Sequence, residues 1–167
     1  MKQSDFYRVG AEKRQDQVIK IGVKNYLLIF GYGIDEDGNG YNMRKNYDHK
    51  PTKTELKEDI TQLIDGTTDS NILQGFRWNE VNVYLSTENQ MNYKAAYDLA
   101  VQTSGATLPV KFKLGEDGSG NAVYHTFEDL AEFTDFYTKA IAYVSDCLNE
   151  GWEEKDSIDY DSLLTDE

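Results

Sequence analysis

Residues 76–100 read FRWNEVNVYLSTENQMNYKAAYDLA and join a strand pattern to a helix pattern. In the first half, large apolar residues recur mostly at every second position, which is typical of a strand with one buried face. Ser86 or Thr87 can cap the helix that follows, because a hydroxyl oxygen accepts hydrogen bonds from the first free N–H groups. Gln90, three residues after Thr87, completes a capping box. We therefore expect one central strand that runs directly into a helix.

The expected helix has an apolar face of its own. Large apolar and small residues recur there at helical spacing, at Met91, Ala95, Ala96, Leu99 and Ala100. This face can lie back on the strand that precedes it. We therefore expect Trp78 and Leu99 to share one core.

Composition and charge indicate a folded, acidic protein. A chain of 167 residues forms one domain or two small ones and can bury ~70% of its unfolded surface. Its 30 acidic and 17 basic residues give a formal net charge of -13, which repels nucleic acid and anionic membranes. The single Cys147 excludes an internal disulfide, and neither a signal peptide nor a run of ~20 apolar residues is present. We expect no nucleic-acid partner, no membrane partner and synthesis in a cytoplasm.

Two β-hairpins and two more helices are predicted around the central strand. The first hairpin occupies residues 24–48, and the helix after it is expected to end at Gly66. The second hairpin occupies residues 108–127, and the longest helix covers about residues 128–149 and stops at Gly151. The expected fold class is α+β. An antiparallel sheet of two hairpins plus the central strand is covered on one side by about three helices.

The same pattern divides the chain into four segments. These are a polar N-terminal arm at 1–17, a hairpin-plus-helix subdomain at 18–68, a strand–helix–hairpin–helix domain at 72–160 and an acidic tail at 161–167. We interpret the arm as a segment that a partner would order.

The loop of the first hairpin offers the candidate metal site. Asp35, Asp37 and Asn39, followed by a glycine, match the opening of a calcium-binding loop. An EF-hand needs a bidentate Glu at the twelfth position, and here that position is Asn46. We therefore interpret the loop as a structural turn, with these three residues as the candidate ligands if it binds metal.

Few residues suit catalysis. His49 and His125 are the only histidines, and neither has a Cys, Ser or Glu at metal-ligand or triad spacing. Gly31-x-Gly33 lacks the third glycine and the following helix of a phosphate loop. The sequence identifies no catalytic residue and no cofactor site, so we expect a protein that is not an enzyme.

Aromatic residues exceed what one small core needs. They make up 13% of the chain, with 12 tyrosines. Phe136 and Tyr143 lie seven residues apart on the longest expected helix, outside the apolar stripe from Leu130 to Leu148. A second apolar face on a helix is typical of a subunit interface. We therefore expect a homo-oligomer that forms contacts through Phe136 and Tyr143.

Three phrases carry a resemblance to known proteins. They are F-x-W-x-x-x-x-V-x-L-S-x-E-N-Q from Phe76 to Gln90, LPVKFK at 108–113 and E-G-W-x-x-K-D from Glu150 to Asp156. With these phrases, the chain from about residue 25 to 159 resembles small proteins of Bacteroidetes phages and prophages, crAss-like phages included. The later part is similar to a domain of unassigned function found in phage tail-fibre and tail-module proteins.

The resemblance implies a role in the virion and identifies no site residues. It implies a non-enzymatic structural protein of the tail or of a tail-fibre attachment, which acts by contacts with other virion proteins. The alternative, which the net charge of -13 favours, is a free acidic phage protein that imitates nucleic acid and inhibits a host DNA-binding protein.

Overall fold

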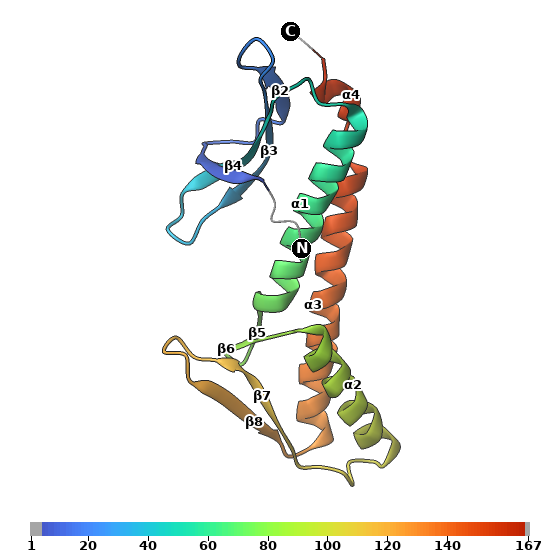
Figure 1. The fold of residues 1–167 in the computed structure, drawn as a ribbon. Helices are drawn as coiled ribbons and strands as arrows, with labels where there is room; N and C mark the ends of the chain where they lie inside the picture. The colour runs from blue at the N-terminus through green and yellow to red at the C-terminus, as the bar shows by residue number, and fades with distance from the viewer. Residues whose placement is uncertain (1–4, 166–167) are drawn as a thin grey trace. The chain divides into compact units, whose positions relative to one another are not determined.

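The computed structural model describes residues 5–165, which have an α+β fold (Figure 1). Eight strands and four helices follow in this order: β1 (Tyr7–Gly10), β2 (Gln17–Lys20), β3 (Tyr26–Ile34), β4 (Gly40–Tyr47), α1 (Lys53–Gln74), β5 (Phe76–Trp78), β6 (Val81–Val83), α2 (Thr87–Gln102), β7 (Val110–Glu116), β8 (Ala122–Phe127), α3 (Leu130–Asp156) and α4 (Tyr160–Leu163). The predicted fold class is confirmed.

The chain divides into two compact units. The first unit holds residues 1–65 and 154–167, and the second unit holds residues 66–153. Both breaks fall inside helices, since α1 and α3 each begin in one unit and end in the other. The sequence had instead predicted one boundary between the two domains, between residues 68 and 72, and a second domain that continues to residue 160.

The first unit is built on a four-stranded antiparallel sheet. Its strand order is β1-β4-β3-β2, and the predicted hairpin of residues 24–48 is present as β3 and β4. The segment that we interpreted as a polar arm contains β1, which pairs with β4 from Tyr7 opposite Arg44 to Gly10 opposite Tyr41. A four-residue edge strand shows no clear alternation by itself, so its partner β4, 31 to 37 positions later in the chain, decides its structure.

The core of the first unit lies between this sheet and two helices. Leu28 and Phe30 of β3 pack with residues of α1 and with Leu163 of α4. Strand β3 is buried at four consecutive positions, Leu27 to Phe30. Successive side chains of a strand point to opposite faces, so both faces of β3 are covered there. Helix α4 lies in the segment expected to be an acidic tail, of which residues 166 and 167 are outside the described residues.

The second unit contains a correction to the central strand. Residues 76–85 do not form one strand but a short hairpin, with β5 paired to β6 from Phe76 opposite Val83 to Trp78 opposite Val81. Asn79 and Glu80 turn the chain with φ values of 48° and 65°. Positive φ at both central residues is the signature of a two-residue type I′ turn.

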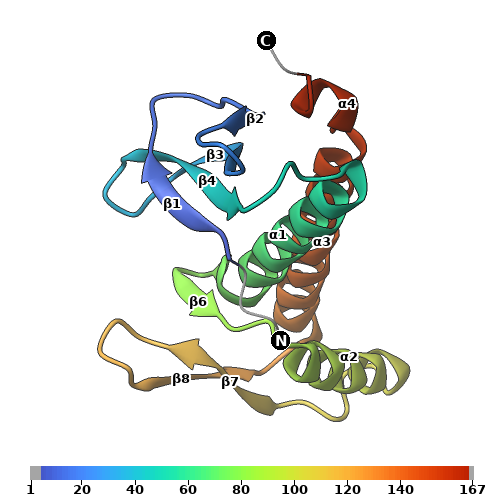
Figure 2. The same ribbon diagram turned by 45° about the horizontal axis from the view of Figure 1, so that its top comes forward.

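The second predicted hairpin is confirmed as β7 and β8. Figure 2 shows β6 beside this hairpin, and the N–H of Tyr84, just after β6, donates to the carbonyl of Leu114 in β7 at 2.8 Å. The β5–β6 hairpin and the β7–β8 hairpin therefore share one face against the helices.

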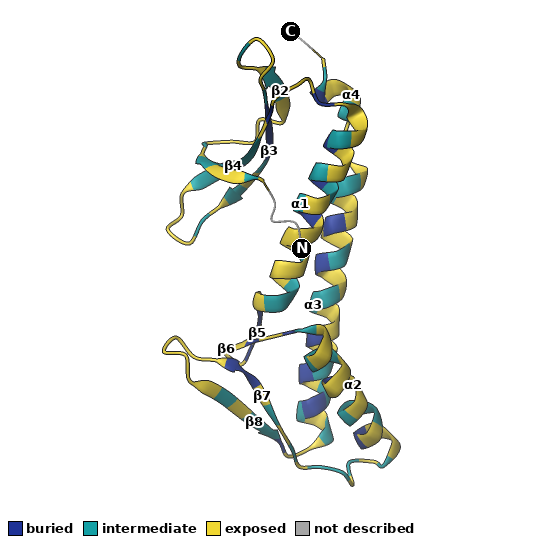
Figure 3. Cartoon of the chain, in the orientation of Figure 1, coloured by how far each residue is buried: buried dark blue, intermediate teal, exposed yellow. Residues whose placement is uncertain are grey.

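Aromatic rings fill the core of the second unit. Phe127, Phe133 and Phe136 are fully buried, and Trp78 and Tyr93 are nearly so. Buried positions recur along one side of α3 (Figure 3). Much of this core is therefore aromatic, with the rings in the edge-on and tilted contacts that such side chains prefer.

Helix α2 begins where predicted but buries a different face. Ser86 is its N-cap, and the hydroxyl oxygen accepts from the N–H of Asn89 at 3.1 Å. The buried residues of α2 are Tyr93 and Ala100, whereas Leu99 is 49% exposed. The prediction that Leu99 shares a core with Trp78 is therefore wrong, because Tyr93 provides the large side chain of the face that packs.

Helices α1 and α3 continue through the glycines that were expected to end them. α1 runs through Gly66 to Gln74, and α3 runs through Gly151 to Asp156. Within the second unit, a Cβ on Gly151 would lie 2.5 Å from Oγ1 of Thr68. Glycine at 151 thus permits the close approach of the two helices, and this packing offsets its low helix propensity.

Candidate functional site

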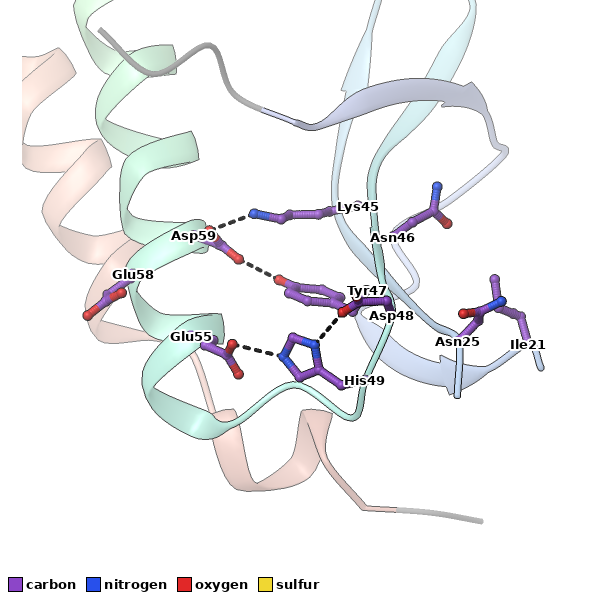
Figure 4. Close-up of a pocket in the computed structure, with 10 residues that line it drawn as sticks. All are labelled: Ile21, Asn25, Lys45, Asn46, Tyr47, Asp48, His49, Glu55, Glu58 and Asp59. Atoms are coloured by element: carbon purple, nitrogen blue, oxygen red, sulfur yellow. Dashed lines mark hydrogen bonds and ion pairs between the residues drawn. The ribbon is translucent and has the colours of Figure 1, made fainter. Parts of the chain in front are cut away.

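A polar groove of about 680 Å³ lies in the first unit (Figure 4). Its volume is in the range of small-ligand sites, so it is the candidate functional site. The turn between β2 and β3, the end of β4 and the first turns of α1 supply its lining: Ile21, Asn25, Lys45, Asn46, Tyr47, Asp48, His49, Glu55, Glu58 and Asp59.

Alternation along β4 directs two side chains toward α1. Lys45 and Tyr47 are two residues apart, so they lie on the same face of the strand. The Tyr47 hydroxyl donates to Oδ2 of Asp59 at 2.6 Å, and Nζ of Lys45 lies 2.8 Å from Oδ1 of the same carboxylate. Burial, followed by the bond to Asp59, raises the pKa of Tyr47. The phenol therefore remains a hydrogen-bond donor.

A capping box places the next carboxylate at the start of α1. The N–H of Thr52 donates to Oε2 of Glu55 at 2.8 Å, and the N–H of Glu55 donates to Oγ1 of Thr52 at 3.2 Å. This reciprocal pair satisfies backbone donors at the start of the helix. The Thr52 backbone bond, followed by the contact with His49, lowers the pKa of Glu55 to about 2. Glu55 is consequently an anion at neutral pH.

His49 lies between two carboxylates at the end of the groove. Nδ1 is 2.6 Å from Oδ1 of Asp48, and Nε2 is 2.9 Å from Oε1 of Glu55. Both contacts raise the pKa of His49, and the contact with Asp48 has the larger effect. The contact with His49 in turn lowers the pKa of Asp48. The ring thus favours the charged form, in which both nitrogens donate to anions.

The polar groups of the groove bond mainly to one another. His49 is held by two carboxylates, and Asp59 is shared between Lys45 and Tyr47. The arrangement ties the end of β4 to the first two turns of α1. Within residues 5–165, no group of three His, Cys, Asp or Glu side chains is placed to hold a metal ion.

The candidate metal ligands Asp35, Asp37 and Asn39 lie in the β3–β4 loop. Oδ1 of Asp35 accepts the N–H of Asp37 at 3.0 Å and the N–H of Asn39 at 2.8 Å. The loop is closed by a bond from the N–H of Asp35 to the carbonyl of Asn39 at 2.9 Å. One oxygen of the Asp35 carboxylate therefore organises the turn.

The loop of the second hairpin has the same construction. Oδ1 of Asp117 accepts from the N–H groups of Ser119 and Asn121 at 2.8 and 2.9 Å, and the N–H of Asp117 donates to the carbonyl of Asn121. Gly38 and Gly120 hold the matching position, each with positive φ. Both turns share the sequence pattern Asp-x-x-Gly-Asn.

The expected interface pair is not exposed. Phe136 is fully buried, and the hydroxyl of Tyr143 donates to the carbonyl of Asn71 at 2.7 Å. The ring of Phe76 lies against both, at centroid distances of 6.3 and 5.4 Å. That side of α3 is covered by the end of α1 and by β5, because α1 continues past Gly66. Phe136 therefore belongs to the core and does not form a contact surface.

The sequence did not predict a second polar cluster, which lies in the second unit. Nε2 of His125 lies 2.7 Å from Oε1 of Glu132, and the indole N–H of Trp78 donates to Oδ2 of Asp135 at 3.0 Å. The rings of His125 and Trp78 meet edge-on at 5.0 Å. These residues come from β5, β8 and α3, so only the folded chain brings them together.

The protein has an α+β fold, and the polar side chains of its groove connect the end of β4 to the start of α1. Residues 54–167 match the family DUF4376, described as a domain of unknown function, and the chain belongs to this family. No curated protein and no solved structure matches the chain significantly. None of the helices described in residues 5–165 is long and apolar enough to cross a membrane.

Proposed function

We propose that this chain is a non-enzymatic structural protein of a bacteriophage virion. It is a component of the tail or of a tail-fibre attachment, made in the cytoplasm of the bacterial host and assembled into the particle. Its partners are other tail proteins and further copies of itself. The sequence phrases that resemble phage tail-module proteins point to this role.

Large apolar side chains that are exposed on both units support a protein that acts by contacts. Several of them are aromatic, the residue class most enriched at protein interfaces. Val23 is 91% exposed, Met91 67%, Ile34 65% and Tyr124 58%. Apolar surface of this kind marks a contact site where it is contiguous. An assembled subunit would cover it with its neighbours.

The test is the protein content of purified particles. Phage whose genome encodes this chain would be purified by density gradient, and the particle proteins quantified by mass spectrometry. We expect the chain at a fixed ratio to the tail proteins, and tail defects in a deletion phage. Absence of the chain from particles with normal tails would contradict the proposal.

The acidic surface favours a second candidate, a free protein that imitates nucleic acid. The net charge of -13 supports this alternative. It predicts that the chain stays in the infected-cell lysate and co-purifies with a host DNA-binding protein. The particle analysis therefore separates the two functions.

A further inference from the structure

The second unit has one sheet face that is basic and aromatic. Buried and exposed positions alternate along its strands, with Phe76, Trp78, Val83 and Leu114 turned to the core. The residues that alternate with them are exposed. We call them the basic face: Arg77 of β5, Asn82 of β6, Tyr84 after β6, Lys111 and Lys113 of β7, and Tyr124 of β8.

Positive charge is concentrated on this face. The second unit contains five basic residues, Arg77, Lys94, Lys111, Lys113 and Lys139, and three of the five belong to the basic face. The other two pair within their own helices, Lys94 with Asp98 and Lys139 with Asp135.

The cations of the basic face lie among exposed rings. Nζ of Lys111 is 4.7 Å from the ring centre of Tyr124, and the rings of Tyr124 and Tyr84 are 58% and 45% exposed. Nζ of Lys113 lies 3.1 Å from Oε1 of Glu116 at the edge of the hairpin. Tyrosine and arginine are residue types enriched where proteins bind each other.

The solvent side of α3 offers a surface of opposite charge. Asp146, Glu150 and Glu153 are spaced by four and three residues, so they form one stripe, and all three are exposed. None of the three forms an ion pair within the described residues 5–165. We call these three residues the acidic face.

We propose that the basic face of one copy of this chain binds the acidic face of a second copy. The cations of the basic face meet unpaired carboxylates, so the two faces are complementary in charge. Single-stranded nucleic acid could also stack on the exposed rings of the basic face. The net charge of -13 opposes that ligand. A second copy carries the same net charge, so its association depends on the local attraction between the two complementary faces.

This contact joins two different surfaces, so it is heterologous and either closes into a ring or continues as a filament. Both surfaces belong to the second unit, residues 66–153. The inference rests on the proposed function as a virion subunit and names the second copy as a partner.

The test is the association of the purified full chain, measured by sedimentation and light scattering over a range of concentration and salt. The double variant Lys111→Glu and Lys113→Glu should raise the dissociation constant by about tenfold or more. Asp146→Lys with Glu150→Lys should do the same from the other surface. Added salt should weaken association of the unmodified chain.

Two further variants make the result specific. The control Lys20→Glu with Lys24→Glu changes net charge by the same amount at exposed positions of the first unit, and it should associate like the unmodified chain. The quadruple variant, with both faces reversed, should associate again because its charges are once more complementary.

Any one of three results would overturn the inference. The unmodified chain could stay monomeric, or the quadruple variant could fail to associate although its circular dichroism is native. An oligonucleotide could also bind the unmodified chain and not the Lys111–Lys113 variant. Acidic-face variants supply the answer if the sheet variant does not fold. Detection of the chain in virions is independent of self-association, so the proposed function can hold while this contact fails.

Discussion

Phe136 allows a direct test of the second-unit core. Its side chain is fully buried, and four rings surround it at centroid distances of 5.0 Å for Phe127, 5.1 Å for Tyr93, 5.2 Å for Trp78 and 6.3 Å for Phe76. Phe136→Ala would leave a cavity lined by four large rings from three elements, β5, α2 and β8. Because such a wall collapses poorly, we expect a loss of ~3–5 kcal/mol in the free energy of unfolding.

Leu99→Ala is the matched control on the same unit. Leu99 is 49% exposed, so its truncation should cost no more than ~0.5 kcal/mol. Urea unfolding followed by circular dichroism measures both variants without depending on Trp78, whose fluorescence the Phe136 change would alter. A loss below ~1 kcal/mol for Phe136→Ala, or equal losses for the two variants, would refute the assignment of Phe136 to the core.

Two more predictions concern helix packing and pH. Gly151→Ala should destabilise the chain by ~1–3 kcal/mol in thermal or urea unfolding, because its Cβ would lie 2.5 Å from Oγ1 of Thr68. Thr68→Ala should restore most of that loss, and no recovery would contradict the proposed contact. Since Asp48 and then Glu55 raise the folded-state pKa of His49 above 6.5, its contribution to stability is present below that value and is lost as pH rises through the raised pKa. The urea midpoint of the unmodified chain should therefore exceed that of His49→Gln at about pH 5 and match it at about pH 9, whereas an equal difference at both pH values would contradict the role of His49.

Local sequence signals predicted the parts of this protein that neighbouring residues decide. The β7–β8 hairpin, the β3–β4 hairpin and the Ser86 cap of α2 all depend on side chains within a few positions of the turn or cap that they form. The type I′ turn at Asn79 and Glu80 is also local, but it was missed because the apolar alternation continues across it.

Contacts between distant segments decided the rest. Helical periodicity identifies the faces of α2 and α3 without stating what covers each, so Leu99 was expected inside and Phe136 outside, and both expectations are wrong. Gly151 would end an isolated helix, yet Thr68 of α1 packs against it from 83 positions earlier in the chain. The groove likewise needs Asp59 of α1 to meet Tyr47 of β4. The spacing of residues along the chain does not predict these contacts, because each contact depends on where two elements pack in three dimensions.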